Sequence, residues 1–260
     1  MPEFCKIERE GALYIVTINR PEVMNSLHPM ANEELGKAFD DFAADPSLWV
    51  AIITGAGDRA FSAGNDLKYQ ATALKGARPS KPPAGFGGLT SRFNLNKPVI
   101  AAVNGIAMGG GFEIALACDI ILASDKAIFA LPEPRVGLAA LAGGVHRLPR
   151  MIPIKQAMGM MLTGRRVGAA EGKEMGFVTE VVKHEELMKE ARRWAGMILE
   201  CSPMSIRATK EAAMQGLTKA SVQEAMAGKY AAVDAMLGSE DFIEGPKAFA
   251  EKRPPQWKGR

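Results

Sequence analysis

The sequence predicts an α/β fold, because short apolar strand patterns alternate with amphipathic helical patterns along most of the chain. The 260 residues are 47% hydrophobic and 23% charged, which is the composition of a globular protein with a sizeable core. Gly, Pro, Asn or Asp bounds each apolar run, as expected for strands. The expected strands are Leu13–Ile18, Val50–Thr54, Val99–Val103, Asp119–Ala123 and Ala127–Ala130.

Helical periodicity appears between several of these strands and dominates from about Ala169 onward. We expect residues 1–200 to form the core that carries the functional site. Residues 201–260 are expected to form a helical C-terminal region, of a kind that often packs against a neighbouring subunit. The expected helices are Met30–Ala44, Phe112–Ala117, Glu186–Leu199, Ser202–Gly216 and Ser221–Met236.

The segment Lys75–Leu89 is rich in Pro and Gly, which disfavours both a helix and a strand. It is expected to be a surface loop or a lid over a ligand.

Charge and composition exclude several classes of partner. The net charge of +3 is too small to indicate nucleic-acid binding and is compatible with a phosphate-bearing ligand. Three cysteines without paired spacing favour a reducing compartment. The N-terminal sequence does not have the pattern of a secretory signal, and no apolar run approaches the roughly 18 residues that span a bilayer. We therefore expect a cytoplasmic protein with neither a nucleic-acid nor a membrane partner.

Common cofactor motifs are absent. Neither a P-loop nor a dinucleotide fingerprint occurs, since the glycines from Gly105 to Gly111 are spaced GxxxGGG. His28, His146 and His184 are scattered without the spacing of a zinc site. We expect no cofactor and no metal, and the missing fingerprint makes a Rossmann-type oxidoreductase an unfavourable interpretation.

The most informative stretch is KPVIAAVNGIAMGGGFE, which runs from Lys97 to Glu113. Its glycines let a ligand approach the backbone, and the N–H of Gly110 would lie at the positive end of the following helix. Glu113 falls in the first turn of that helix. Alone, a glutamate in this position commonly just complements the helix dipole or forms a capping box.

Two further segments end a strand with chemically useful groups. In FSAGNDLK, residues 61–68, the turn can leave the N–H of Asn65 free to donate, although an ordinary strand-to-helix turn is the simpler interpretation. In LPEPRVG, residues 131–137, two prolines fix the direction of Glu133. Two carboxylates beside free backbone donors can hold a water and transfer protons as acid and base.

These motifs resemble the crotonase superfamily, and specifically the enoyl-CoA hydratases that keep two catalytic glutamates. The resemblance runs from INRPEVMNSL at 18–27 through FSAGNDLK, the Lys97–Glu113 stretch, LPEPRVG and AGGVHRLPR. The ending EGPKAFAEKRPPQWKGR is similar to those of bacterial hydratases, including the carnitinyl-CoA dehydratase group. The family fold is a spiral of ββα units with a helical C-terminal region that mediates trimer formation, commonly as a dimer of trimers.

The resemblance implies a role for each matching position. Glu113 corresponds to the glutamate that activates water, and Glu133 to the glutamate that exchanges a proton next to the thioester carbonyl. The N–H groups of Asn65 and Gly110 correspond to the oxyanion hole. The substrate is then an acyl-CoA thioester, with coenzyme A as part of the substrate and no separate cofactor.

The same resemblance suggests which residues bind substrate. Ala63 corresponds to a position near the adenine, and Lys68 to one that can meet a phosphate. Phe112 and Leu141 are expected to line the acyl pocket. The full set expected to contact substrate or coenzyme A is Ala63, Asn65, Asp66, Leu67, Lys68 and Gly110.

Two alternatives within the same fold remain open. One is an enoyl-CoA double-bond isomerase, which needs a single base; FSAGNDL occurs in some of them. Dienoyl-CoA isomerases are disfavoured, because they carry a carboxylate where Leu141 stands and an aspartate where Glu113 stands. The other alternative is a non-catalytic acyl-CoA-binding or RNA-binding protein, which the retention of both glutamates disfavours.

Overall fold

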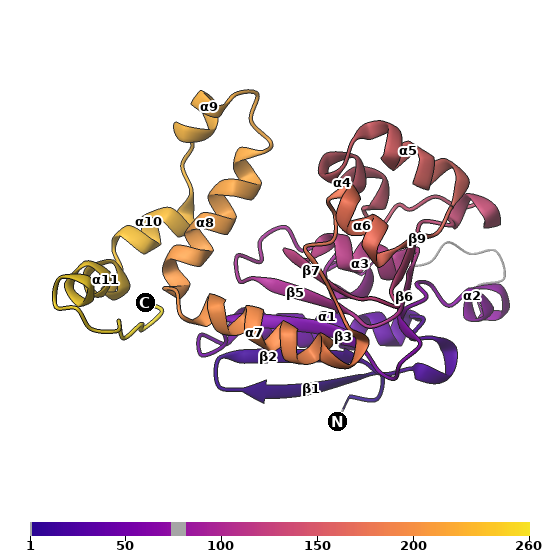
Figure 1. The fold of residues 1–260 in the computed structure, drawn as a ribbon, viewed down its shortest axis with the longest axis horizontal. Helices are drawn as coiled ribbons and strands as arrows, with labels where there is room; N and C mark the ends of the chain where they lie inside the picture. The colour runs from indigo at the N-terminus through magenta and orange to yellow at the C-terminus, as the bar shows by residue number, and fades with distance from the viewer. Residues whose placement is uncertain (1, 74–81) are drawn as a thin grey trace.

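The computed structural model describes residues 2–73 and 82–260 and contains two β-sheets (Figure 1). The larger sheet has the strand order β1-β2-β3-β5-β7-β10. Its first pair is antiparallel and all the others are parallel. The strands are β1 (Cys5–Glu10), β2 (Leu13–Ile18), β3 (Val50–Gly55), β5 (Val99–Val103), β7 (Ile120–Ser124) and β10 (Glu180–Val182).

The smaller sheet has the order β4-β6-β8-β9, and its first three strands are parallel. The chain alternates between the sheets: β3, β5 and β7 each lead into β4, β6 and β8, and a helical segment follows each pair. This alternation is the expected spiral of ββα units, so the predicted fold class is confirmed. The segments are β4 (Ala60–Ser62), β6 (Ile106–Met108), β8 (Ile128–Ala130), β9 (Val167–Gly168), α2 (Leu67–Ala73), α3 (Gly110–Ala117) and the 3₁₀ turn η3 (Glu133–Val136).

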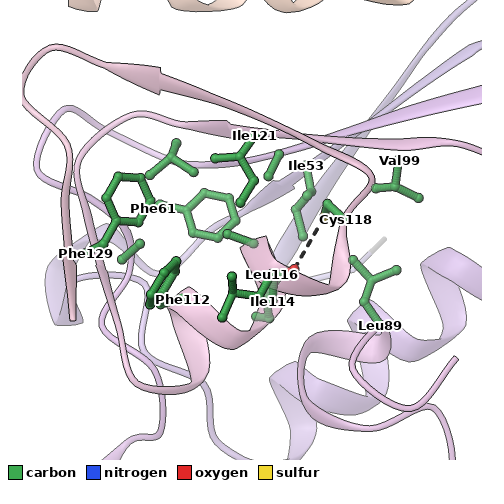
Figure 2. Close-up of a cluster of buried hydrophobic side chains, with 14 of the residues drawn as sticks. Ile53, Phe61, Leu89, Val99, Phe112, Ile114, Leu116, Cys118, Ile121 and Phe129 are labelled. Atoms are coloured by element: carbon green, nitrogen blue, oxygen red, sulfur yellow. Dashed lines mark hydrogen bonds between the residues drawn. The ribbon is translucent and has the colours of Figure 1, made fainter. Parts of the chain in front are cut away.

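Side chains alternate across the larger sheet and build a core on each face. Val50 and Ile52 of β3 pack with the buried face of α7 (Leu187–Leu199), which lies over the larger sheet in Figure 1. Ala51 and Ile53 belong to the second core, shared with α1 (Pro29–Ala44) and with the smaller sheet. Figure 2 shows part of this second core. Burial on both faces explains why the parallel strands are continuous apolar runs.

The remaining helices form two groups. The helices α4 to α6 lie near the smaller sheet (Figure 1), and α8 to α11 come after α7 at the end of the chain. The helices α8 to α11 extend away from the two sheets (Figure 1) and form the expected helical C-terminal region. In residues 2–73 and 82–260, every helix falls short of the length and apolarity that a membrane span requires. The helices are α4 (Gly144–Met151), α5 (Ile154–Thr163), α6 (Ala169–Met175), α8 (Pro203–Gly216), α9 (Val222–Met226), α10 (Ala231–Leu237) and α11 (Glu240–Ala250), with 3₁₀ turns η1 (Pro21–Val23), η2 (Phe86–Gly88) and η4 (His184–Glu186).

The prediction of one continuous helix over Ser221–Met236 is wrong. The segment is divided into α9 and α10 by a short break. Gly228 lies in that break, and a Cβ there would meet the Tyr230 hydroxyl oxygen at 2.6 Å. The same hydroxyl donates to the Ala225 carbonyl oxygen at 2.6 Å, so the tyrosine closes the break.

Candidate active site

Three neighbouring parallel strands bring the predicted site residues to one edge of the smaller sheet. The turn after β4 carries Asn65, β6 leads into α3 with Gly110 and Glu113, and β8 leads into Glu133. Because β4, β6 and β8 are adjacent and parallel, their carboxyl ends lie at the same edge. In open α/β folds this edge is where ligands bind.

The two predicted backbone donors lie on turns that pack closely. A Cβ placed on Gly64 would lie 2.8 Å from the Gly110 nitrogen and 2.5 Å from the Met108 carbonyl oxygen, and Gly64 has φ +86°. Leu27 forms a β-bridge with Asn65 that fixes this turn. Within residues 2–73 and 82–260, neither the Asn65 nor the Gly110 N–H donates a hydrogen bond. The pair is therefore available to a ligand oxygen.

Glu113 is a buried carboxyl with one defined partner. It is 3% exposed, and its Oε1 accepts a hydrogen bond of 2.8 Å from the Gly144 N–H at the start of α4. Burial raises its pKa to about 7, the Gly144 hydrogen bond opposes this shift, and the charge of Glu133 adds to it. Glu113 is thus suited to exchange protons near neutral pH.

Glu133 is the second carboxyl, and one of its oxygens lacks a partner. In the described part of the chain, its Oε2 is buried without a hydrogen bond. Burial also raises the pKa of Glu133. Leaving a polar atom buried and unpaired costs about 1–3 kcal/mol, and such atoms are often kept for function.

Gly109 lies between the two carboxyls. Its N–H donates to the Ala130 carbonyl oxygen at 2.9 Å, and its own carbonyl oxygen accepts from the Glu113 N–H at 2.9 Å. A Cβ at this position would meet Glu133 Oε1 at 2.9 Å, and the backbone has φ +54° and ψ −125°. A glycine therefore lets the strand end that leads to Glu133 approach the helix that carries Glu113.

The combined geometry supports proton transfer next to a carbonyl group. Two backbone N–H groups can bind an oxygen that gains negative charge, and the buried carboxyl of Glu113 and the partly buried carboxyl of Glu133 lie on the adjacent elements. Donors of this type stabilise an enolate-like intermediate, while the carboxyls move protons to and from carbon or water. Residues 2–73 and 82–260 contain no cluster of three His, Cys, Asp or Glu side chains that could hold a metal.

The residues predicted to contact coenzyme A, from Ala63 to Lys68, differ in how far they are exposed. Leu67 and Lys68 are exposed at the start of α2, and Ala63 is partly buried. The Asp66 carboxylate instead forms an ion pair of 3.0 Å with Arg20, with both side chains largely buried, and accepts from the Tyr69 N–H. Asp66 therefore fixes the turn beside Asn65, while Lys68 is exposed at the surface.

The two predicted acyl-pocket residues lie in different surroundings. Phe112 is fully buried, with its ring centroid 5.2 Å from that of Phe129 and 5.1 Å from that of Phe177, in the core drawn in Figure 2. The ring therefore packs in the core, and its assignment to the acyl pocket stays a prediction. Leu141 is 70% exposed, and its role stays a prediction.

The structure also identifies Gly144, to which no role was assigned from the sequence, and it places Phe86, which the sequence suggested as part of an apolar lid. Gly144 supplies the N–H that holds Glu113, and Phe86 lies against Gly110, where a Cβ would meet its Cδ1 at 2.8 Å. The double glycine at Gly143 and Gly144, where α4 begins, was the available signal for a backbone donor. Phe86 belongs to the predicted Lys75–Leu89 loop, whose residues 75–81 lie outside the described ranges.

The raised pKa of Glu113 predicts a pH-dependent gain in stability for Glu113→Gln. Between the ordinary carboxyl pKa and about 7, the folded protein binds more protons than the unfolded chain, so the free energy of unfolding falls as pH rises. Glutamine carries no charge. Denaturant unfolding should show the variant gaining up to about 3 kcal/mol on the wild type between pH 4.5 and 8.

The matched control is Glu22→Gln, at an exposed glutamate on η1. Its stability difference from the wild type should not follow the Glu113→Gln trend. If the difference for Glu113→Gln is the same at pH 5 and pH 8, the buried charge assigned to Glu113 is wrong.

Comparisons with known proteins identify the class that this fold and site define. Residues 8–260 match the enoyl-CoA hydratase/isomerase family, and the chain belongs to that family. It is 46% identical over 266 residues to carnitinyl-CoA dehydratase of Escherichia coli strain K12, with 100% of both chains covered.

Solved structures of enoyl-CoA hydratases show the same fold. The enzyme from Mycobacterium tuberculosis H37Rv is 35% identical, with a TM-score of 0.90 and 100% of both chains covered. The enzyme from Mycobacterium marinum is 36% identical, with a TM-score of 0.91 and the same coverage. The predicted family resemblance is therefore confirmed.

Proposed function

We propose that the protein catalyses the reversible hydration of a 2-enoyl-CoA thioester to a 3-hydroxyacyl-CoA. The observation that carries this proposal is the buried carboxyl of Glu113 and the partly buried carboxyl of Glu133 on elements adjacent to the N–H groups of Asn65 and Gly110, which donate no hydrogen bond within the described residues. The similarity to a dehydratase and to several hydratases supports the same reaction in its two directions.

The proposed reaction follows from the positions of these groups. The thioester oxygen accepts hydrogen bonds from both N–H groups, which draws electron density from the double bond. Glu113 takes a proton from water as the water oxygen bonds to carbon 3. Glu133 gives a proton to carbon 2, next to the carbonyl. The reverse sequence removes water from the 3-hydroxyacyl-CoA.

Purified protein should convert crotonyl-CoA to 3-hydroxybutyryl-CoA, because both carboxyls needed for addition of water are present. The measurement is product formation followed by liquid chromatography, with a 3-enoyl-CoA assayed beside the 2-enoyl-CoA. Conversion of the 3-enoyl-CoA alone would favour the isomerase instead. Binding of coenzyme A thioesters without turnover would favour the non-catalytic alternative.

The finer contacts and the assembly are also proposals. We infer that Lys68 meets a phosphate of coenzyme A, since its charge lies at the surface beside Asn65. We further propose assembly into a homotrimer or a dimer of trimers through α9 to α11, and light scattering measures the subunit count. Large apolar side chains are exposed there, among them Met226 at 82%, Ile243 at 70% and Phe249 at 87%.

A further inference from the structure

The ring of Phe86 lies directly beside one of the two oxyanion donors. A Cβ added to Gly110 would lie 2.8 Å from both Cδ1 and Cζ of Phe86. Real Cβ atoms essentially never come so close to another heavy atom, so the ring edge is in contact with the Gly110 backbone. Phe86 is partly buried, and it packs against the core that includes Ile114 of α3.

Several hydrogen bonds hold this ring in place. The Phe86 N–H donates to Thr90 Oγ1 at 2.8 Å, and the Gly87 N–H donates to Asn32 Oδ1 of α1 at 2.7 Å. The Thr90 carbonyl oxygen accepts from Arg147 of α4 at 3.0 Å, on the helix whose first N–H holds Glu113. The segment is thus tied to both α1 and α4, which fixes the ring relative to the site.

The glycines around Phe86 explain how the chain reaches this position. Gly85, Gly87 and Gly88 all have positive φ, at +77°, +60° and +70°. A Cβ at Gly88 would meet the Gly36 backbone of α1 at 2.7 Å. The segment can therefore lie flat against α1 and α3 only with glycine on either side of the phenylalanine.

We infer that Phe86 is the side chain that limits the size of the acyl group next to the thioester carbonyl. This inference rests on the proposed function, because the Gly110 N–H is what places the thioester oxygen beside the ring. An acyl group bonded to that carbonyl passes the ring within its first carbons. A methyl branch on carbon 2 then competes with the ring for space, so the site favours 2-enoyl-CoA substrates that are unbranched at carbon 2.

The test compares two substrates in variants that change the ring in opposite directions. Phe86→Ala should raise the ratio of kcat/KM for a 2-methyl-2-enoyl-CoA over its unbranched analogue by about tenfold or more, the usual effect of one methyl group in an apolar pocket. Phe86→Trp should lower the same ratio. Phe86→Leu should give a smaller rise and retains more of the packing if the alanine variant does not fold.

Phe93→Ala is the matched control, because Phe93 follows Phe86 in the same segment but is 82% exposed. It should leave the ratio unchanged. A merely structural role of Phe86 would lower both rates together, and an unchanged ratio in all three Phe86 variants would overturn the inference. If the wild type hydrates neither substrate, the proposed function itself is wrong, so the two failures are distinguishable.

Discussion

Glu113→Gln and Glu133→Gln are each expected to lower kcat for crotonyl-CoA hydration by about 10²–10⁴-fold, the usual contribution of an acid or base group. Glutamine keeps the size of the side chain and cannot take or give a proton. Because the two backbone donors remain, binding of a saturated acyl-CoA should be retained. Steady-state kinetics and isothermal titration calorimetry measure the two effects separately.

A second measurement distinguishes the two carboxyls. Exchange of the carbon 2 protons of butyryl-CoA with D₂O needs a base at that carbon and no added water. Glu133→Gln should lose this exchange, whereas Glu113→Gln should keep most of it, and proton NMR follows both. Glu22→Gln, at an exposed glutamate, should behave as the wild type in each assay. Near-normal hydration by either site variant would contradict the assigned pair.

Gly64→Ala is expected to reduce kcat by about 10²–10³-fold, the effect of losing one oxyanion donor. The new methyl group would lie 2.8 Å from the Gly110 nitrogen, so the two turns must separate. The φ of +86° adds backbone strain of about 1–3 kcal/mol, which lowers the melting temperature as well. Enzyme kinetics and thermal unfolding of the same preparation measure both consequences.

Gly176→Ala is the control that distinguishes the effect of backbone strain from the effect of displacing the Gly110 N–H. Gly176 ends α6 with φ +99°, and a Cβ there would meet nothing within 4 Å. This variant should lose stability through strain and keep its kcat. If Gly64→Ala is as active as Gly176→Ala when folded, Gly110 does not bind the thioester oxygen.

The sequence predicted the long buried strands and β8, and it missed β1 and the other short strands. Val99–Val103 was correct to the residue, because burial on both faces makes the run apolar throughout. The strand β1 (Cys5–Glu10) was missed, since it is an edge strand with mostly exposed polar residues and takes its structure from pairing with β2. Three-residue strands such as β6 are too short to show a period.

The site was predicted in part for similar reasons. The spacing of Glu113 and Glu133 in the sequence carries no information on their proximity, which depends on β6 and β8 being neighbours in one sheet. Motif resemblance supplied that link. The surroundings of Phe112 could not be predicted from its place beside Glu113, because neighbouring residues on a helix point in different directions: Glu113 contacts Gly144 and Phe112 packs against Phe129.

The construction of the site from three strand ends has a consequence for how activity arises during folding. Along the chain, β6 follows β4 after about forty-five residues and β8 follows β6 after about twenty, and each strand delivers one part of the site. No single local segment holds a complete set of reacting groups. Contacts between distant segments form slowly, because closing the intervening chain costs entropy. Recovery of turnover on refolding therefore reports the completion of the whole small sheet, later than the return of helical signal.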